Sequence, residues 1–213
     1  MIGKWNKSVI LSYIGLSFSV LGMFLIFKGY ELKYIFCCFI AAGVCDMFDG
    51  TVARRCKRTE EEKLFGIELD SLVDVFSFVA FPIVIAYSLG LNEWYHIPAY
   101  ILYGIFGVAR LAHFNITVED TSKPRKYYEG LPVTMSALIF PLLFSLSFIL
   151  EKALFNTVYF IVLILVGILF ILKIKIPKPG IKISILLLIL SIIFSILYLF
   201  VLWHKYIIEK LIE

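Results

Sequence analysis

Seven long apolar segments run through this chain of 213 residues, and they constrain its fold more than any other feature. A helix needs about 20 mainly apolar residues to cross the hydrocarbon core of a bilayer. The segments approach or exceed that length, and 61% of all residues are hydrophobic. The pattern predicts an all-α, polytopic integral membrane protein, a helical bundle forming one domain over residues 1–213. The expected spans are 9–27, 34–53, 65–89, 95–115, 131–150, 154–172 and 181–203.

The Lys and Arg residues predict how the bundle is oriented. If the N-terminus is cytoplasmic and the spans alternate, fifteen of the 20 Lys and Arg residues fall on the inner side. Because cytoplasmic connections carry an excess of Lys and Arg, we expect this orientation, in the cell membrane. The basic stretch KIKIPKPGIK at 173–182 is interpreted as a solvated linker on that side.

Four aspartates lie at the inner ends of two neighbouring spans. Asp46 and Asp49 are three residues apart, and Asp70 and Asp74 are four apart, so each pair shares one face of its helix. Antiparallel helices would bring the pairs together at one depth. Acidic side chains are costly inside a membrane, and a divalent cation would relieve their mutual repulsion. Oxygen ligands suit Mg²⁺, Mn²⁺ or Ca²⁺, and a pair of metals is common in phosphate chemistry.

Small residues and one arginine accompany the aspartates. Gly50, Ala53 and Gly66 would let a ligand approach the backbone closely. Arg54 carries a planar donor fork that suits phosphate oxygens. Together with the membrane setting, these residues indicate a lipid substrate that contains phosphate.

The joint pattern D-x-x-D-G-x-x-A-R followed by G-x-x-x-D-x-x-x-D resembles the signature of the CDP-alcohol phosphatidyltransferases. All eight signature positions are present, although the spacer between Arg54 and Gly66 has eleven residues, longer than in many members. We expect the longer spacer to loosen the loop. The resemblance implies a six-helix core, here with one or two extra spans, that is usually dimeric and opens to the cytoplasm. It implies attack of an alcohol on a CDP-linked lipid, which releases CMP.

The resemblance also implies roles for the signature residues. Asp46, Asp49 and Asp70 would bind Mg²⁺ or Mn²⁺, with two ions expected, and Asp74 would be the general base and a further metal contact. Asp70 and Asp74 are thus the expected catalytic residues. The nucleotide site would comprise Asp46, Asp49, Gly50, Ala53, Arg54 and Gly66.

Three further stretches resemble the phosphatidylserine synthase branch of this family. They are GIELDSLVDVFSFVAFP at 66–82, GVARLAHFN at 107–115 and YYEGLPVTMSA at 127–137. They divide the domain into signature helices with their loop (40–80), an acceptor-side segment (105–140) and C-terminal spans (150–205). L-serine is therefore the expected acceptor. The candidate residues for binding it are Arg110, which is costly to place inside a span, and Asn115, Lys123, Arg125 and Lys126.

Two alternatives stay open at this point. The same chemistry could use glycerol 3-phosphate, or inositol or its phosphate, as the acceptor. A cation-coupled membrane transporter would also carry carboxylates within its spans. The expected partners are the CDP-linked lipid, with diacyl or isoprenoid (archaetidyl) chains, serine, membrane lipids and a second copy of the chain, with no nucleic acid.

Overall fold

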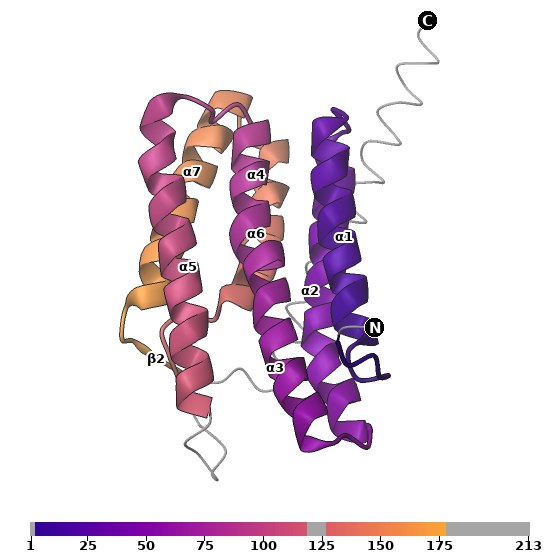
Figure 1. The fold of residues 1–213 in the computed structure, drawn as a ribbon. Helices are drawn as coiled ribbons and strands as arrows, with labels where there is room; N and C mark the ends of the chain where they lie inside the picture. Colours follow the sequence, from indigo (N-terminus) through magenta and orange to yellow (C-terminus); the bar gives the residue numbers. More distant parts are fainter. Residues whose placement is uncertain (1–2, 119–126, 178–213) are drawn as a thin grey trace, which may run out of the picture.

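A computed structural model describes residues 3–118 and 127–177 of the chain. The described part is a helical bundle (Figure 1). Its main elements are α1 (Ile10–Phe27), α2 (Leu32–Arg55), α3 (Glu60–Asp74), a π-helical turn (Val75–Ala80), α4 (Phe81–Ser88), α5 (Ile97–Val118), β1 (Tyr127–Glu129), α6 (Ser136–Phe144), α7 (Lys152–Ile171) and β2 (Lys175–Pro177). Short 3-10 turns precede α5 and flank α6, at Trp94–His96, Val133–Met135 and Ser145–Phe148.

Five helices of the described residues are long and apolar enough to cross a membrane. They are Ile10–Phe27, Leu32–Arg55, Glu60–Ser88, Trp94–Ile116 and Lys152–Ile171, and Val133–Ser147 is a shorter apolar helix. These six correspond to the first six predicted spans, so the all-α membrane fold is confirmed. The third span is one continuous helix in which α3, the π-helical turn and α4 follow each other. The seventh predicted span, 181–203, lies outside the described residues.

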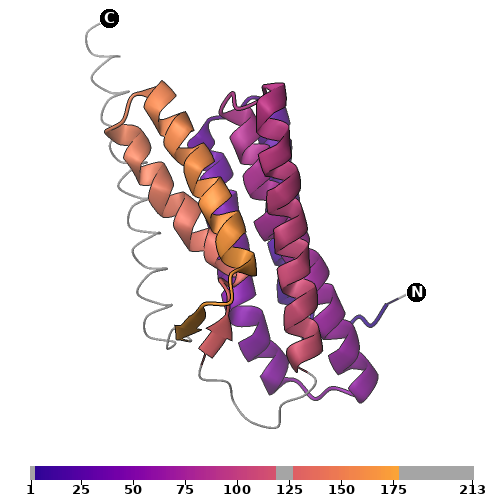
Figure 2. The same cartoon turned by 90° about the vertical axis from the view of Figure 1, so that its left-hand side faces the viewer.

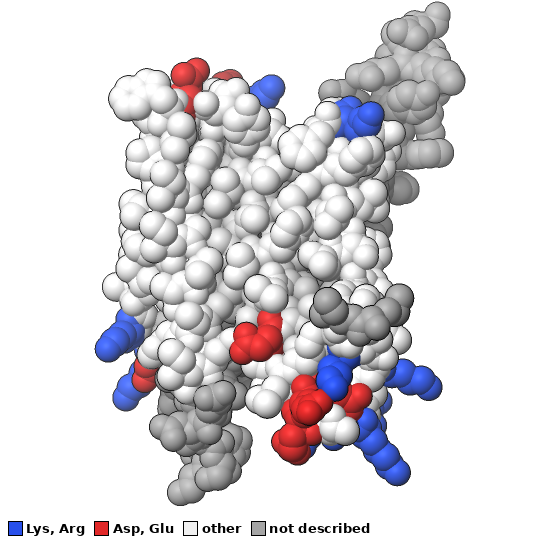
Figure 3. All heavy atoms as spheres, viewed as in Figure 1, with Lys and Arg blue, Asp and Glu red and all other residues white. Residues whose placement is uncertain are grey.

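In Figure 1 the third span, α3–α4, runs between α1 on one side and α5 on the other, and α6 packs directly against α2. Figure 2 shows α6 and α7 side by side, with the two short strands below their ends. On the face drawn in Figure 3, charged side chains gather toward the two ends of the bundle and leave an uncharged belt between them. This distribution is what a spanning bundle requires, because the belt faces hydrocarbon.

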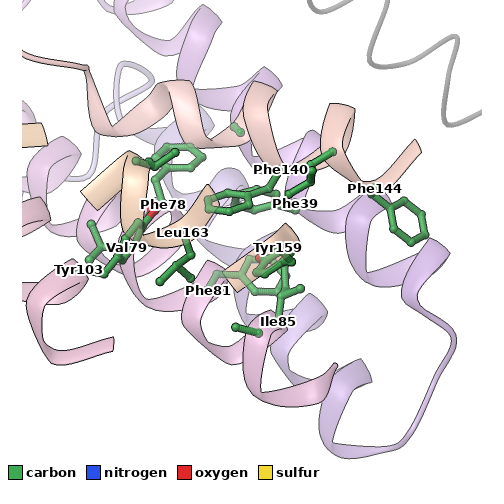
Figure 4. Packing of buried hydrophobic residues seen from close by; sticks show 14 of the residues in the cluster. Phe39, Phe78, Val79, Phe81, Ile85, Tyr103, Phe140, Phe144, Tyr159 and Leu163 are labelled. Atoms are coloured by element: carbon green, nitrogen blue, oxygen red, sulfur yellow. The ribbon is translucent and has the colours of Figure 1, made fainter. Parts of the chain in front are cut away.

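Aromatic side chains fill the centre of the bundle (Figure 4). Phe39 of α2 packs against Phe78, Phe81 and Phe140, which belong to the third span and to α6. Aromatic pairs at these separations add to the free energy gained from burying their area. The core therefore fixes α4 against α2 just beyond the aspartates.

A two-stranded antiparallel sheet joins two stretches that the sequence analysis left outside any element. Tyr127, Tyr128 and Glu129 pair with Pro177, Ile176 and Lys175 respectively. Lys175–Pro177 of the predicted linker 173–182 thus form a strand, while Lys173, Ile174 and Lys175 are exposed. The pairing satisfies backbone groups that leave the apolar bundle, and it closes the end of α7 against the segment that enters α6.

Candidate active site

Asp46 and Asp49 lie in the C-terminal half of α2, and Asp70 and Asp74 in the C-terminal half of α3, the helix that follows α2 after residues 56–59. Carboxylate oxygens of Asp46, Asp49 and Asp70 all lie within 4.8 Å of one another. Asp74 follows Asp70 by four residues at the end of α3 and so lies on the same face of that helix. Asp49 and Asp74 are buried. The structure thus shows the predicted juxtaposition of the two pairs.

The surroundings of this cluster fit a divalent cation. Within residues 3–118 and 127–177, none of the Lys or Arg ion pairs reaches these aspartates. Oδ1 of Asp74 is buried without a hydrogen-bond partner. Paired carboxylates repel each other unless a proton or a cation lies between them. An all-oxygen donor set of this kind suits a hard cation such as Mg²⁺ or Mn²⁺.

A cavity of about 210 Å³ opens beside the cluster. Asp49 and Asp70 line it together with Gly50, Ala53, Arg54 and Gly66, so five of the six residues expected at the nucleotide site face the cavity. Asp46 and Asp74 are not among its lining residues, so they lie behind the two carboxylates that face the cavity. The full lining is Ser8, Val9, Ser12, Asp49, Gly50, Ala53, Arg54, Arg58, Gly66, Ile67 and Asp70.

Two guanidinium groups lie over the two glycines of the signature. A Cβ atom added at Gly50 would be 3.6 Å from Nη1 of Arg54, and one added at Gly66 would be 3.7 Å from Nη1 of Arg58. Larger side chains at either glycine would therefore compete for the space that the guanidinium occupies. Sequence reasoning missed Arg58, because it lies in the spacer. The longer spacer itself was the one signal in the sequence that pointed to it.

The N-terminal segment also contributes to the cavity. Ser12 of α1 donates a buried hydrogen bond from Oγ to Oδ2 of Asp49 at 3.0 Å. A charge-assisted hydrogen bond of this kind is stronger than a neutral one and fixes the carboxylate. Nothing in the local sequence distinguishes Ser12 from other serines of the first span, so it was missed as well.

The spacer is ordered, and the expectation of a loosened loop is wrong. Most of its residues extend α2 and α3, which leaves only 56–59 between the two helices. Thr59 begins α3 with a capping box: its Oγ1 accepts from the N–H of Glu62, and the Glu62 carboxylate accepts from the N–H of Thr59. Lys4 forms an ion pair with Glu61 at 2.6 Å. These contacts position Arg58 at the entrance of α3.

The residues expected to bind the acceptor are not all brought together. Arg110 is buried and lines a second cavity of about 190 Å³, and it does not line the first. Asn115 instead exchanges hydrogen bonds with Ser71 of α3, which ties α5 to the helix that carries Asp70. Lys123, Arg125 and Lys126 lie outside the described residues.

The second cavity lies between the C-terminal ends of α5 and α7. His113 and Glu129 belong to its lining, with Nε2 of His113 at 3.5 Å from Oε2 of Glu129. Glu129 was not among the residues predicted for either site. The complete lining is Ala109, Arg110, His113, Glu129, Phe170, Ile171, Leu172 and Lys173.

Comparisons with known proteins identify the family. The CDP-alcohol phosphatidyltransferase family model matches residues 5–197. A Saccharomyces cerevisiae CDP-diacylglycerol–serine O-phosphatidyltransferase is 42% identical over 108 residues, which cover 47% of this chain and only 38% of the yeast protein. A Helicobacter pylori protein of the same name is 34% identical over 186 residues, 82% of this chain and 76% of its own length. One from Methanocaldococcus jannaschii is 34% identical over 153 residues, 72% and 68% of the two chains. The chain belongs to the CDP-alcohol phosphatidyltransferase family, and it is a membrane-bound transferase.

Proposed function

We propose that this protein transfers a phosphatidyl or archaetidyl group from a CDP-linked lipid to the hydroxyl of L-serine and releases CMP. The observation that carries the proposal is the cluster of four aspartates behind a cavity that two guanidinium groups flank. The names of the relatives from yeast, H. pylori and M. jannaschii support serine as the acceptor.

Asp46, Asp49, Asp70 and Asp74 would hold two Mg²⁺ or Mn²⁺ ions in this proposal. When bound, the ions neutralise charge on the pyrophosphate of the CDP-linked lipid. The unpartnered Oδ1 of Asp74 and the convergence of carboxylate oxygens from Asp46, Asp49 and Asp70 support this assignment.

The chain's own side chains would orient the lipid and move the proton. Arg54 and Arg58 bind phosphate oxygens at the cavity. The serine hydroxyl attacks the phosphorus that carries the lipid, the bond from that phosphorus to the bridging oxygen breaks, and CMP leaves. Asp74 accepts the hydroxyl proton as the general base.

The second cavity would hold the amino acid. Arg110 offers its guanidinium to the serine carboxylate, and Glu129 supplies an acidic group that can face the ammonium. A zwitterion needs one group of each sign, whereas glycerol 3-phosphate or inositol does not carry an ammonium. This complementarity favours serine over those acceptors.

Both cavities would face the cytoplasm, since basic residues gather beside them, with Arg54, Arg55, Lys57 and Arg58 at the end of α2 and Lys173 and Lys175 after α7. The water-soluble acceptor would then reach the site from inside the cell. We also propose that the protein works as a homodimer, as the family resemblance implies.

CMP release from the purified protein tests the proposal. The protein in detergent is given a diacyl or an ether-linked CDP-lipid with Mn²⁺, and serine, glycerol 3-phosphate and inositol are compared in parallel. We expect release with serine alone, abolished by a chelator. Release with a different alcohol would overturn the acceptor, and metal flux without CMP release would favour a transporter.

A matched pair of variants links that activity to the aspartates. Asp70→Asn removes one carboxylate of the cluster, whereas Glu68→Gln removes one on the exposed part of the same helix. We expect about a 100-fold or greater loss of CMP release only in Asp70→Asn. Equal activity of the two variants would contradict the proposed site.

A further inference from the structure

A π-helical turn follows Asp74 directly in the third span. The turn covers Val75–Ala80, and the N–H of Phe81 donates to the carbonyl of Phe76, five residues earlier. An α-helix would use the carbonyl four residues earlier. Such a turn inserts one residue into an α-helix, which rotates the part before it by about 100° relative to the part after it. π-turns of this kind are rare and occur often at functional sites.

Pro82 accounts for the turn. Proline has no N–H, and its ring clashes with the carbonyl four residues earlier in a regular α-helix. That carbonyl belongs to Phe78, whose side chain lies in the core with Tyr103 (Figure 4). The orphaned oxygen accepts two hydrogen bonds from elsewhere in the bundle, from Oη of Tyr103 at 3.1 Å and from Oγ of Ser136 at 3.2 Å.

These two hydroxyls are almost completely buried. Tyr103 is 1% exposed and Ser136 is 0% exposed. They come from α5 and from the start of α6, so two helices that carry no signature residue hold the distorted part of the third span. Neither residue lines the two cavities. Their partner, the carbonyl of Phe78, lies four residues beyond Asp74.

The core prevents α4 from turning to compensate. Phe81 at the start of α4 is 0% exposed and packs edge-on against Phe39 of α2. Asp46 and Asp49 are on α2 as well. Loss of the inserted residue would therefore rotate α3, and with it Asp70 and Asp74, away from the aspartates of α2.

We propose that Pro82, Tyr103 and Ser136 are positioning residues, which hold the π-helical turn at Val75–Ala80 and through it set the rotation at which Asp70 and Asp74 face Asp46 and Asp49. The residues touch neither substrate nor metal. Only the kcat measurement rests on the proposed function, since Mn²⁺ affinity reports the alignment of the carboxylates without any turnover.

Pro82→Ala gives the first test. The alanine N–H can compete with Oη of Tyr103 and Oγ of Ser136 for the carbonyl of Phe78, so a regular α-helix becomes available and the variant should fold in detergent. Residues that orient metal ligands typically change metal affinity about 10- to 100-fold when they are lost. We expect Mn²⁺ affinity, measured by electron paramagnetic resonance of free Mn²⁺, to fall by about tenfold or more. The kcat should fall comparably, with the KM for serine within about twofold of the original.

The double variant Tyr103→Phe/Ser136→Ala gives the second test, with Tyr159→Phe as its control. Tyr159 is also fully buried, and its hydroxyl donates to the carbonyl of Pro82 at 3.1 Å. That carbonyl lies beyond the turn, where the N–H of Ala86 is in α-helical register with it. We expect Mn²⁺ affinity and kcat to fall in the double variant and to persist in the control.

Unchanged Mn²⁺ affinity in a folded Pro82→Ala would overturn the proposal. If Pro82→Ala does not fold, the second test decides. Equal Mn²⁺ affinities of the double variant and Tyr159→Phe would overturn the proposal, because the Tyr103 and Ser136 hydroxyls would then contribute to stability alone. If the original protein binds Mn²⁺ but releases no CMP with serine, the proposed function fails while the affinity comparison still decides this inference.

Discussion

Gly130→Ala would test the geometry of the second cavity. Gly130 follows β1 with φ of +76°. An added Cβ would lie 2.7 Å from the carbonyl oxygen of Phe170 and 3.1 Å from that of Leu172, both backbone atoms at the end of α7. It would also come within 3.5 Å of Nε of Arg110. The substitution would therefore displace the end of α7 or the side chain of Arg110, both of which line the second cavity.

The expected loss of stability has two parts. A left-handed backbone costs an L-residue about 1–2 kcal/mol. Forcing a methyl group into a packed site costs about 1–3 kcal/mol more, and here relief requires movement of the α7 backbone. The free energy of unfolding should thus fall by about 2–5 kcal/mol.

Gly29→Ala separates the two parts. Gly29 has φ of +72°, and a Cβ there would meet nothing within 4 Å. It should lose only the backbone part, about 1–2 kcal/mol. Both variants are unfolded by added SDS in detergent micelles, and the KM for serine is measured from CMP release at saturating CDP-lipid. We expect a higher KM for serine in Gly130→Ala alone.

Two results would refute this reasoning. Equal destabilisation of the two variants would mean that the approach of Gly130 to α7 is not close. Strong destabilisation of Gly130→Ala with an unchanged KM for serine would mean that the second cavity does not bind the acceptor.

Three further substitutions probe single side chains. Arg58→Ala should raise the KM for the CDP-linked lipid by about tenfold, the equivalent of one hydrogen bond to a charged group. Arg55→Ala changes an exposed neighbour and should leave this KM unchanged. Equal effects of the two substitutions would show that Arg58 does not bind the lipid. Arg110→Lys should raise the KM for serine by about tenfold, because an ammonium cannot bind a carboxylate with two parallel hydrogen bonds, and an unchanged value would rule out its proposed role. Ser12→Ala should weaken Mn²⁺ binding by about tenfold through the lost hydrogen bond to Asp49, which a titration of free Mn²⁺ would detect or disprove.

The spans and the aspartate cluster could be predicted from local features of the sequence. Hydrophobic length is a local property, so six of the predicted spans could be read directly from composition. Helical spacing is local as well, and it placed Asp46 with Asp49 and Asp70 with Asp74 on their faces before any packing was known. A short connection then leaves two neighbouring helices little choice but to run antiparallel.

How distant segments complete the site depends on the packing of the whole bundle. The hydroxyls of Tyr103 and Ser136 reach Phe78 across 25 and 58 residues of sequence. The pairing of β1 with β2 likewise joins segments on either side of α6 and α7. Pro82 predicts a disturbed helix from the sequence alone. Which groups donate hydrogen bonds to the carbonyl of Phe78 depends on which helices pack beside it. Such contacts follow from the burial of the whole bundle, and no local pattern of residues encodes them.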